Sequence, residues 1–224
     1  VPEHIAYSMS DKPAGPWKYM GEIMPLQDTG SFTNHCGVID YKGNSYFFYH
    51  TGKLPGGGGF GRSVAIEQFK YNADGTFPVI NATSEGVAPV GTLNPYKRVE
   101  AETIAFSEGL KSEPNAKTGV YISEIHNGDY IKVRSVDFGN NGPEKFTVSA
   151  ASALRGGTIE VRTDSISGQL VSELYIPSTG GWEEWKTFET EVKKKISGLH
   201  DVYFVFKGRK GCKLFNFDWW KFGQ

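Results

Sequence analysis

The chain has 224 residues, and its 24 basic and 25 acidic side chains leave a formal net charge of −1 at pH 7. The Lys and Arg residues are scattered and form no basic stripe, which argues against nucleic acid and against an anionic membrane as partners. No run approaches the roughly 20 apolar residues that a membrane-spanning helix needs, so no membrane partner is expected.

The first 93 residues favour strands and turns over helices. Their expected elements are a strand at residues 4–10, a hairpin at 37–50 around Gly43-Asn44, a strand at 62–71 and a short closing strand at 77–80. The residues that follow, 81–93, are small and polar without periodicity. We therefore expect two domains, residues 1–93 and residues 94–224.

Beyond residue 94 the chain reads as a long series of strands. They are expected near residues 98–106, 120–122, 129–138, 144–151, 157–163, 169–176, 185–192, 202–207 and 212–222. About nine short strands in roughly 130 residues are typical of a two-sheet sandwich. The sequence therefore predicts an all-β chain that ends in a β-sandwich.

Two strands of this second domain carry carboxylates within apolar surroundings. If residues 214–220 alternate regularly, Asn216 and Asp218 share one face, while Phe215, Phe217 and Trp219 share the other. Glu100 and Glu102 share a face in the same way. Neighbouring carboxylates repel unless a cation lies between them, and oxygen ligands suit calcium. A solvated edge-strand face explains the same spacing, and spacing alone leaves both interpretations open.

Six motifs in chain order carry a resemblance to a known family. They are Val99-Glu100-Ala101-Glu102, Asn127-Gly128-Asp129-Tyr130-Ile131, Val136-Asp137-Phe138-Gly139, Ser178-Thr179-Gly180-Gly181-Trp182, Gly198-Leu199-His200-Asp201-Val202 and Phe215-Asn216-Phe217-Asp218-Trp219. Together they resemble a family 6 carbohydrate-binding module. The resemblance implies a jelly-roll β-sandwich with a structural calcium ion, held by Glu100, Glu102 and Asp218.

The same resemblance implies a sugar clamped between two aromatic rings, Tyr121 and Trp182, and fixed by Asn216, with Glu113 at the rim of the cleft. The physics agrees, because a sugar ring has an apolar face that stacks on aromatic rings and hydroxyls that need polar partners. Other roles stay open: Trp182 as a loop anchor, Tyr121 as a core residue and Asn216 as a loop cap. Trp185, Trp219 and Trp220 lie in strand patterns and are mostly expected in the core.

Residues 1–93 resemble a second family. The segments Ile5-Ala6-Tyr7-Ser8-Met9-Ser10, Gly15-Pro16-Trp17-Lys18, Thr33-Asn34-His35-Cys36-Gly37 and Gly61-Arg62-Ser63-Val64 are similar to the last part of a glycoside hydrolase family 43 propeller. The resemblance implies an incomplete five-bladed propeller whose catalytic carboxylates lie upstream of this region. His35 and Arg62 match positions near the family's substrate pocket.

These resemblances imply a secreted chain that binds xylan, arabinoxylan or a related β-glycan and carries no catalytic residues of its own. The missing propeller blades are a further expected partner. The alternatives are an active arabinofuranosidase or β-xylosidase and a purely structural sandwich. Trp182 after two glycines disfavours the structural reading, because a core Trp is unusual in such a turn.

Overall fold

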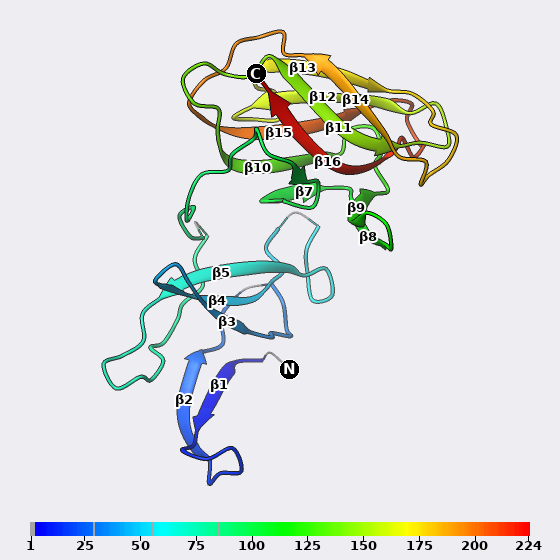
Figure 1. Cartoon of the computed structure of the whole chain (residues 1–224). Coiled ribbons are helices and arrows are strands. Elements are labelled where there is room, and N and C mark those ends of the chain that lie inside the picture. The colour runs from blue at the N-terminus through cyan, green and yellow to red at the C-terminus, as the bar shows by residue number, and fades with distance from the viewer. Residues whose placement is uncertain (1–2, 29, 55, 85) are drawn as a thin grey trace. The chain divides into compact units, whose positions relative to one another are not determined.

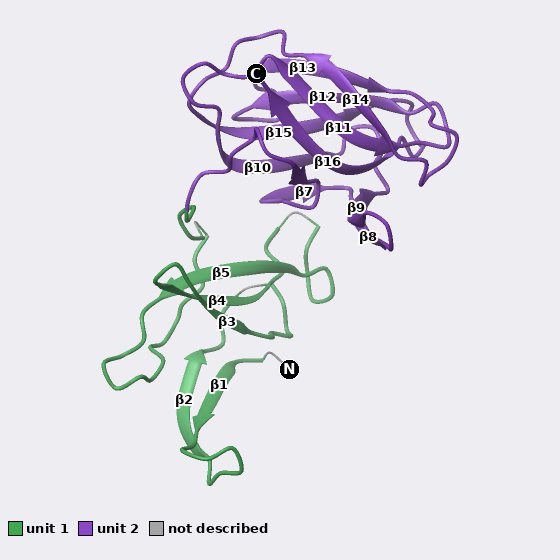
Figure 2. Cartoon of the chain, in the orientation of Figure 1, with its two compact units in different colours: residues 1–90 green, residues 91–224 purple. Residues whose placement is uncertain are grey.

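The computed structural model describes residues 3–28, 30–54, 56–84 and 86–224 (Figure 1). These residues form sixteen β-strands and no helix, so the all-β prediction is confirmed. The described part accordingly holds no helix with the length and apolar character to cross a membrane. Two compact units make up the chain, residues 1–90 and 91–224 (Figure 2), whereas the sequence predicted a boundary between residues 93 and 94.

Unit 1 contains a hairpin and a small antiparallel sheet. The hairpin pairs β1 (Ile5–Met9) with β2 (Lys18–Met24). The sheet is made of β3 (Gly37–Tyr41), β4 (Asn44–Thr51) and β5 (Ser63–Phe69). Its buried cluster consists of Ile5, Ile23, Met24, Phe47, Tyr49, Phe69 and Ile80.

The predicted strand at residues 77–80 is wrong. Pro78 has no N–H to give to a ladder, and the segment forms single contacts instead of pairing along its length. The Ile80 N–H donates to the Ile23 carbonyl at 2.7 Å, and the Phe77 N–H donates to the Tyr7 hydroxyl at 3.2 Å. Strand β2 was not among the predicted strands.

Unit 2 is a sandwich of two antiparallel sheets that lie face to face (Figure 1). One sheet has the order β13 (Leu170–Ile176), β12 (Gly157–Thr163), β15 (Leu199–Lys207), β10 (Tyr130–Asp137) and β7 (Phe106–Glu108). The other has the order β14 (Lys186–Glu191), β11 (Lys145–Ala151), β16 (Asn216–Gly223), β9 (Gly119–Ser123) and β8 (Lys111–Asn115), with β6 (Val99–Glu100) also paired to β16.

Aromatic side chains from both sheets fill the core of the sandwich. The ring of Phe204 on β15 lies 5.6 Å from Phe146 on β11 and 5.0 Å from Trp220 on β16, measured between ring centroids. All three side chains are fully buried. Contacts of this kind join the sheets because alternate residues of each strand point into the space between them.

The strand predicted at residues 98–106 divides into two pieces. The Thr103 N–H donates to the Glu100 carbonyl at 2.9 Å, so the chain turns directly after β6. The next strand, β7, belongs to the opposite sheet. Glu100 therefore ends a strand and Glu102 lies in the turn, which corrects the view that strand alternation places both on one face.

Strand β16 contains a bulge at Asp218. On the paired strand β11, Ser149 pairs with Trp219 and the next residue, Ala150, pairs with Phe217. Asp218 is therefore the extra residue of the bulge. The bulge reverses the alternation beyond it: Phe217 and Trp220 are fully buried, while Trp219 is partly exposed. The predicted common face of Phe217 and Trp219 is therefore wrong.

Candidate functional site

Trp182 lies on the loop that joins β13 to β14, and hydrogen bonds fix this loop to the body of the sandwich. Two of them connect it to Ser152: the Thr179 N–H donates to the Ser152 carbonyl and the Ser152 N–H donates to Thr179 Oγ1, both at 2.8 Å. Gly180 has a φ of +104°, a backbone conformation that favours glycine. The loop thereby holds the indole of Trp182 partly exposed.

Asn216, the first residue of β16, connects this loop to the second sheet. Its side-chain Nδ2 donates to the Trp182 carbonyl at 2.7 Å. The residue is 1% exposed, and its Oδ1 is buried with no hydrogen-bond partner in the described part of the chain. A buried amide oxygen without a donor is costly, so a hydrogen bond to this atom from a ligand would be favourable.

Tyr121 on β9 is buried, with 4% of its surface exposed. Its hydroxyl donates to Glu113 Oε2 at 2.9 Å, and its ring meets Trp185 edge-on at 5.2 Å between centroids. Burial, together with the Glu113 carboxylate, raises the pKa of Tyr121 to about 12. The phenol therefore stays protonated near neutral pH and presents little open ring surface.

Glu113 lies opposite Tyr121 across the β8–β9 pair. Its Oε1 accepts a hydrogen bond from the Ser123 hydroxyl at 2.7 Å. This bond, with the one from Tyr121, lowers the pKa of Glu113. Glu113, predicted at the rim of the cleft, thus lies on the short strand β8 and has two fixed donors.

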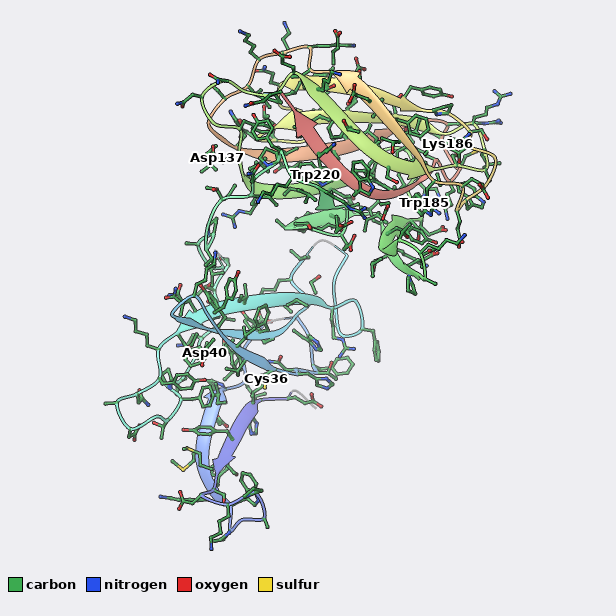
Figure 3. The ribbon with its side chains drawn as sticks, in the orientation of Figure 1. Cys36, Asp40, Asp137, Trp185, Lys186 and Trp220 are labelled. Atoms are coloured by element: carbon green, nitrogen blue, oxygen red, sulfur yellow. The ribbon has the colours of Figure 1, made fainter. Side chains whose placement is uncertain are left out.

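Two residues near Trp182 were not assigned to the site from the sequence. The Lys213 ammonium lies 4.6 Å from the centroid of the Trp182 ring and 3.3 Å from Glu124 Oε1. Trp185, expected in the core, lies next to Lys186, the first residue of β14 (Figure 3). It is partly exposed, and its Nε1 is buried with no partner among the described residues. In the sequence, only their positions point to the site: Lys213 lies shortly before Asn216, and Trp185 lies shortly after Trp182.

Glu100, Glu102 and Asp218, the three carboxylates predicted to hold calcium, gather around the bulge of β16. The Arg98 guanidinium pairs with both oxygens of Glu100 at 2.8 Å and lies 3.8 Å from Asp218 Oδ2. In the described residues, Glu102 Oε2 and Asp218 Oδ1 are buried without a hydrogen-bond partner. Burial raises the pKa of Asp218.

Arg98 thus supplies the positive charge beside two of these carboxylates. Across the described ranges, no group of three or more His, Cys, Asp or Glu side chains is arranged to hold a metal ion. The two unpartnered carboxylate oxygens nevertheless have the chemistry of a cation site, because a buried carboxylate oxygen without a donor is stabilised by a hard cation.

The two predicted pocket residues of unit 1 lie around His50. The His35 ring is 5.3 Å from the His50 ring, and Arg62 Nη1 donates to Thr33 Oγ1 at 2.5 Å. Partial burial, with the charges of Arg62 and His35 nearby, lowers the pKa of His50. His35 and His50 both line a cavity of about 220 Å³. His50 was not among the site residues predicted from the sequence.

Comparisons with known proteins find a family match for the sandwich and a similarity that covers the whole chain. Residues 100–224 match the family described as carbohydrate binding module (family 6). The arabinoxylan arabinofuranohydrolase of Bacillus subtilis (strain 168) is 40% identical over 237 residues, which cover 100% of this chain and 45% of that protein.

Two solved structures agree with this result. A glycoside hydrolase family 43 arabinoxylan arabinofuranohydrolase from Bacillus subtilis in complex with cellotetraose has a TM-score of 0.83 and 39% identity, covering 100% of this chain and 48% of that one. A family 6 carbohydrate-binding module from Clostridium cellulolyticum in complex with xylose has a TM-score of 0.56 and 37% identity, covering 59% of this chain and 100% of that one. The chain thus spans less than half the length of the arabinofuranohydrolase.

Proposed function

The chain belongs, through residues 100–224, to the family 6 carbohydrate-binding modules, and on that basis we propose that it binds xylan, arabinoxylan or a related β-glycan. The binding residues are Trp182, Tyr121, Asn216 and Glu113. The observation that carries the proposal is the partly exposed Trp182 indole, on a loop that Asn216 fixes by a hydrogen bond to the Trp182 carbonyl. The indole suits the apolar C–H face of a sugar ring, and the amide oxygen of Asn216, which has no partner in the described residues, suits a hydroxyl donor.

Lys213 takes part in the binding step. Its ammonium now covers the Trp182 ring at 4.6 Å, where the apolar face of a sugar would stack. A partly exposed cation–π contact is worth about 0.5–1 kcal/mol, so the sugar displaces Lys213 at a modest cost. The displaced ammonium then donates to sugar hydroxyls or remains with Glu124.

Tyr121 has a different role from the one expected for a second stacking ring. With 4% of its surface exposed, it offers little area for a sugar to cover. We assign it to the wall of the cleft, where its hydroxyl orients the ionised Glu113 carboxylate. Glu113 then accepts a hydrogen bond from a sugar hydroxyl at the rim. Trp182 supplies the stacking surface.

Calcium belongs to the proposal as a structural ion. Glu102 and Asp218 would hold it through their unpartnered oxygens, and Glu100 would join them when Arg98 gives up its pairing. The ion supplies charge that ties β6, the following turn and β16 together. This role concerns the stability of the sandwich rather than contact with sugar.

Unit 1 carries the second part of the proposal. Its resemblance to an arabinofuranohydrolase supports the view that the chain forms part of a secreted enzyme that degrades arabinoxylan. In that setting, His35 and Arg62 belong to the substrate pocket and the catalytic carboxylates lie outside this sequence. The sandwich then raises the local concentration of the enzyme on its substrate.

Affinity electrophoresis tests the binding proposal. We expect gels containing soluble arabinoxylan or β-glucan to retard the chain, and gels containing the α-glucan pullulan to leave its mobility unchanged. Equal mobility in all of these gels would contradict sugar binding at this site.

The competing function is arabinofuranosidase or β-xylosidase activity of the chain itself, which the 40% identity to the Bacillus subtilis enzyme favours. Release of a chromogenic product from an arabinofuranoside or a xyloside, above the rate in buffer, would establish it. We expect no release, because acid and base carboxylates are both required for glycoside hydrolysis.

A further inference from the structure

A cavity of about 450 Å³ adjoins the loop that carries Trp182 and the segment that leads into β16 at Asn216. Its lining includes Leu154, Arg155, Ser178, Arg209, Lys213 and Leu214. Ser178 begins the segment that leads to Trp182, and Lys213 is the residue whose ammonium covers the Trp182 ring. A ligand stacked on Trp182 can therefore extend into this cavity past Lys213.

The charge of the cavity is one-sided. Among the described residues that line it, three are cationic, Arg155, Arg209 and Lys213, and no lining residue is acidic. Lys213 has an acidic partner, Glu124, at 3.3 Å. Within the described residues, neither the Arg155 nor the Arg209 guanidinium makes a hydrogen bond or an ion pair. Both are exposed on loops, with their full donor capacity open to a ligand.

We infer that this cavity recognises the carboxylate of a uronic acid carried by the bound β-glycan, an inference that rests on the proposed sugar binding. Guanidinium groups bind carboxylates through paired N–H donors, which a neutral sugar hydroxyl cannot match. The exposed side chain of Leu154 lines the same cavity and offers an apolar surface to the pyranose ring of the uronate. The chain thereby selects acidic xylan over neutral xylan.

Calorimetric titration with three probes tests the inference on the full chain. The probes are a xylo-oligosaccharide that bears one glucuronic acid, the same oligosaccharide with its carboxyl group reduced to the alcohol, and the unsubstituted backbone. Exposed ion pairs contribute little individually, so two of them predict roughly fivefold tighter binding of the acidic probe. This preference should disappear at about 1 M salt, where the screening length is about 3 Å.

Variants assign the preference to the cavity. The double variant Arg155→Gln and Arg209→Gln should bind all three probes with the affinity of the neutral ones. Arg134→Gln, an exposed arginine on β10 that does not line the cavity, should keep the preference. Both proteins should unfold at the temperature of the unmodified chain.

The possible failures are distinguishable. Equal affinity for the acidic and carboxyl-reduced probes would overturn the inference while sugar binding stands. A preference that survives in the double variant would also overturn it. If none of the probes binds, the proposed function itself fails, and the uronate site fails with it.

Discussion

Asn216 is the residue that connects the two halves of the candidate site. Its amide nitrogen holds the backbone of Trp182, and its buried oxygen has no partner in the described chain. The sequence left two interpretations of Asn216 open, a loop cap and a residue that binds sugar. In the structure the amide nitrogen donates the capping bond, while the amide oxygen, the only acceptor of this side chain, has no donor in the described residues.

We therefore expect Asn216→Ala to affect both stability and binding. Loss of the bond to the Trp182 carbonyl should cost about 1 kcal/mol of unfolding free energy, measured by urea denaturation. Affinity for xylo-oligosaccharide should fall by about tenfold, because the vacant acceptor and the loop position are lost together. The exposed Asn140→Ala is the control. An unchanged affinity with reduced stability would assign Asn216 to capping alone.

The exposed fraction of Tyr121 could not be predicted from the sequence. Its position and its partner Glu113 were both selected from motifs, but its exposure depends on Trp185 and on strand β8. Strand β8 was not predicted, because Glu113-Pro114-Asn115 carries turn-forming residues rather than alternating apolar ones. Pro114 fits there because β8 is an edge strand of its sheet.

At the scale of elements, regular alternation predicted most strands well. The pattern Thr158-Ile159-Glu160-Val161-Arg162 lies within β12, whose bounds agree with the prediction. The pattern fails where the backbone departs from regular geometry, at the bulge of β16 and at the turn after β6. A bulge cannot be read from alternation because one extra residue exchanges the two faces of the strand.

The bulge makes opposite predictions for two adjacent tryptophans. Trp220→Ala should cost about 3–5 kcal/mol of unfolding free energy, because it removes a fully buried indole from the core. Trp219→Ala should cost about 1 kcal/mol or less, since its ring is partly exposed and its main contact is the Arg98 guanidinium at 5.4 Å. Urea denaturation of both variants checks this, and equal costs would contradict the assigned bulge.

The carboxylates around β16 predict a calcium response that depends on pH. Without a cation, burial gives Asp218 a raised pKa, so the folded chain holds a proton that the unfolded chain releases. The unfolding free energy then falls as pH rises from about 3.9, the ordinary pKa of Asp, through the raised value. Bound calcium opposes this fall because it favours the ionised carboxylate.

Thermal unfolding with calcium or with a chelator measures the effect. The gap between the two midpoints should be small near pH 4 and should widen toward about pH 7, reaching roughly 8 °C for calcium at about 100 times its Kd. In Asp218→Asn the gap should be smaller at every pH. Identical midpoints with calcium and chelator near neutral pH would argue against the ion.

At the scale of the whole molecule, the two units have separate buried clusters. The buried cluster of the sandwich includes most of the large buried aromatic side chains. The strands of both its sheets pair with other strands of unit 2. Unit 1 exposes apolar side chains on its small sheet, among them Val38, Ile39, Tyr41 and Val64. The sequence predicted this division from the loss of periodicity before residue 94.

Residues 91–224 should therefore fold on their own, with cooperative urea unfolding and the sugar affinity of the whole chain. Residues 1–90 alone should aggregate, because their exposed apolar residues and sheet edges have no cover within the unit. Light scattering and calorimetry of the two pieces check this. A sandwich that binds sugar only in the presence of residues 1–90 would show that the units share the site.

The central claim is that the Trp182 indole is the surface on which a sugar stacks. Calorimetric titration of xylo-oligosaccharide into Trp182→Ala tests it most directly, with Trp17→Ala as the control because Trp17 is an exposed indole of unit 1. We predict that Trp182→Ala loses measurable binding at an unchanged unfolding temperature and that Trp17→Ala binds normally. Undiminished binding by Trp182→Ala would contradict the account.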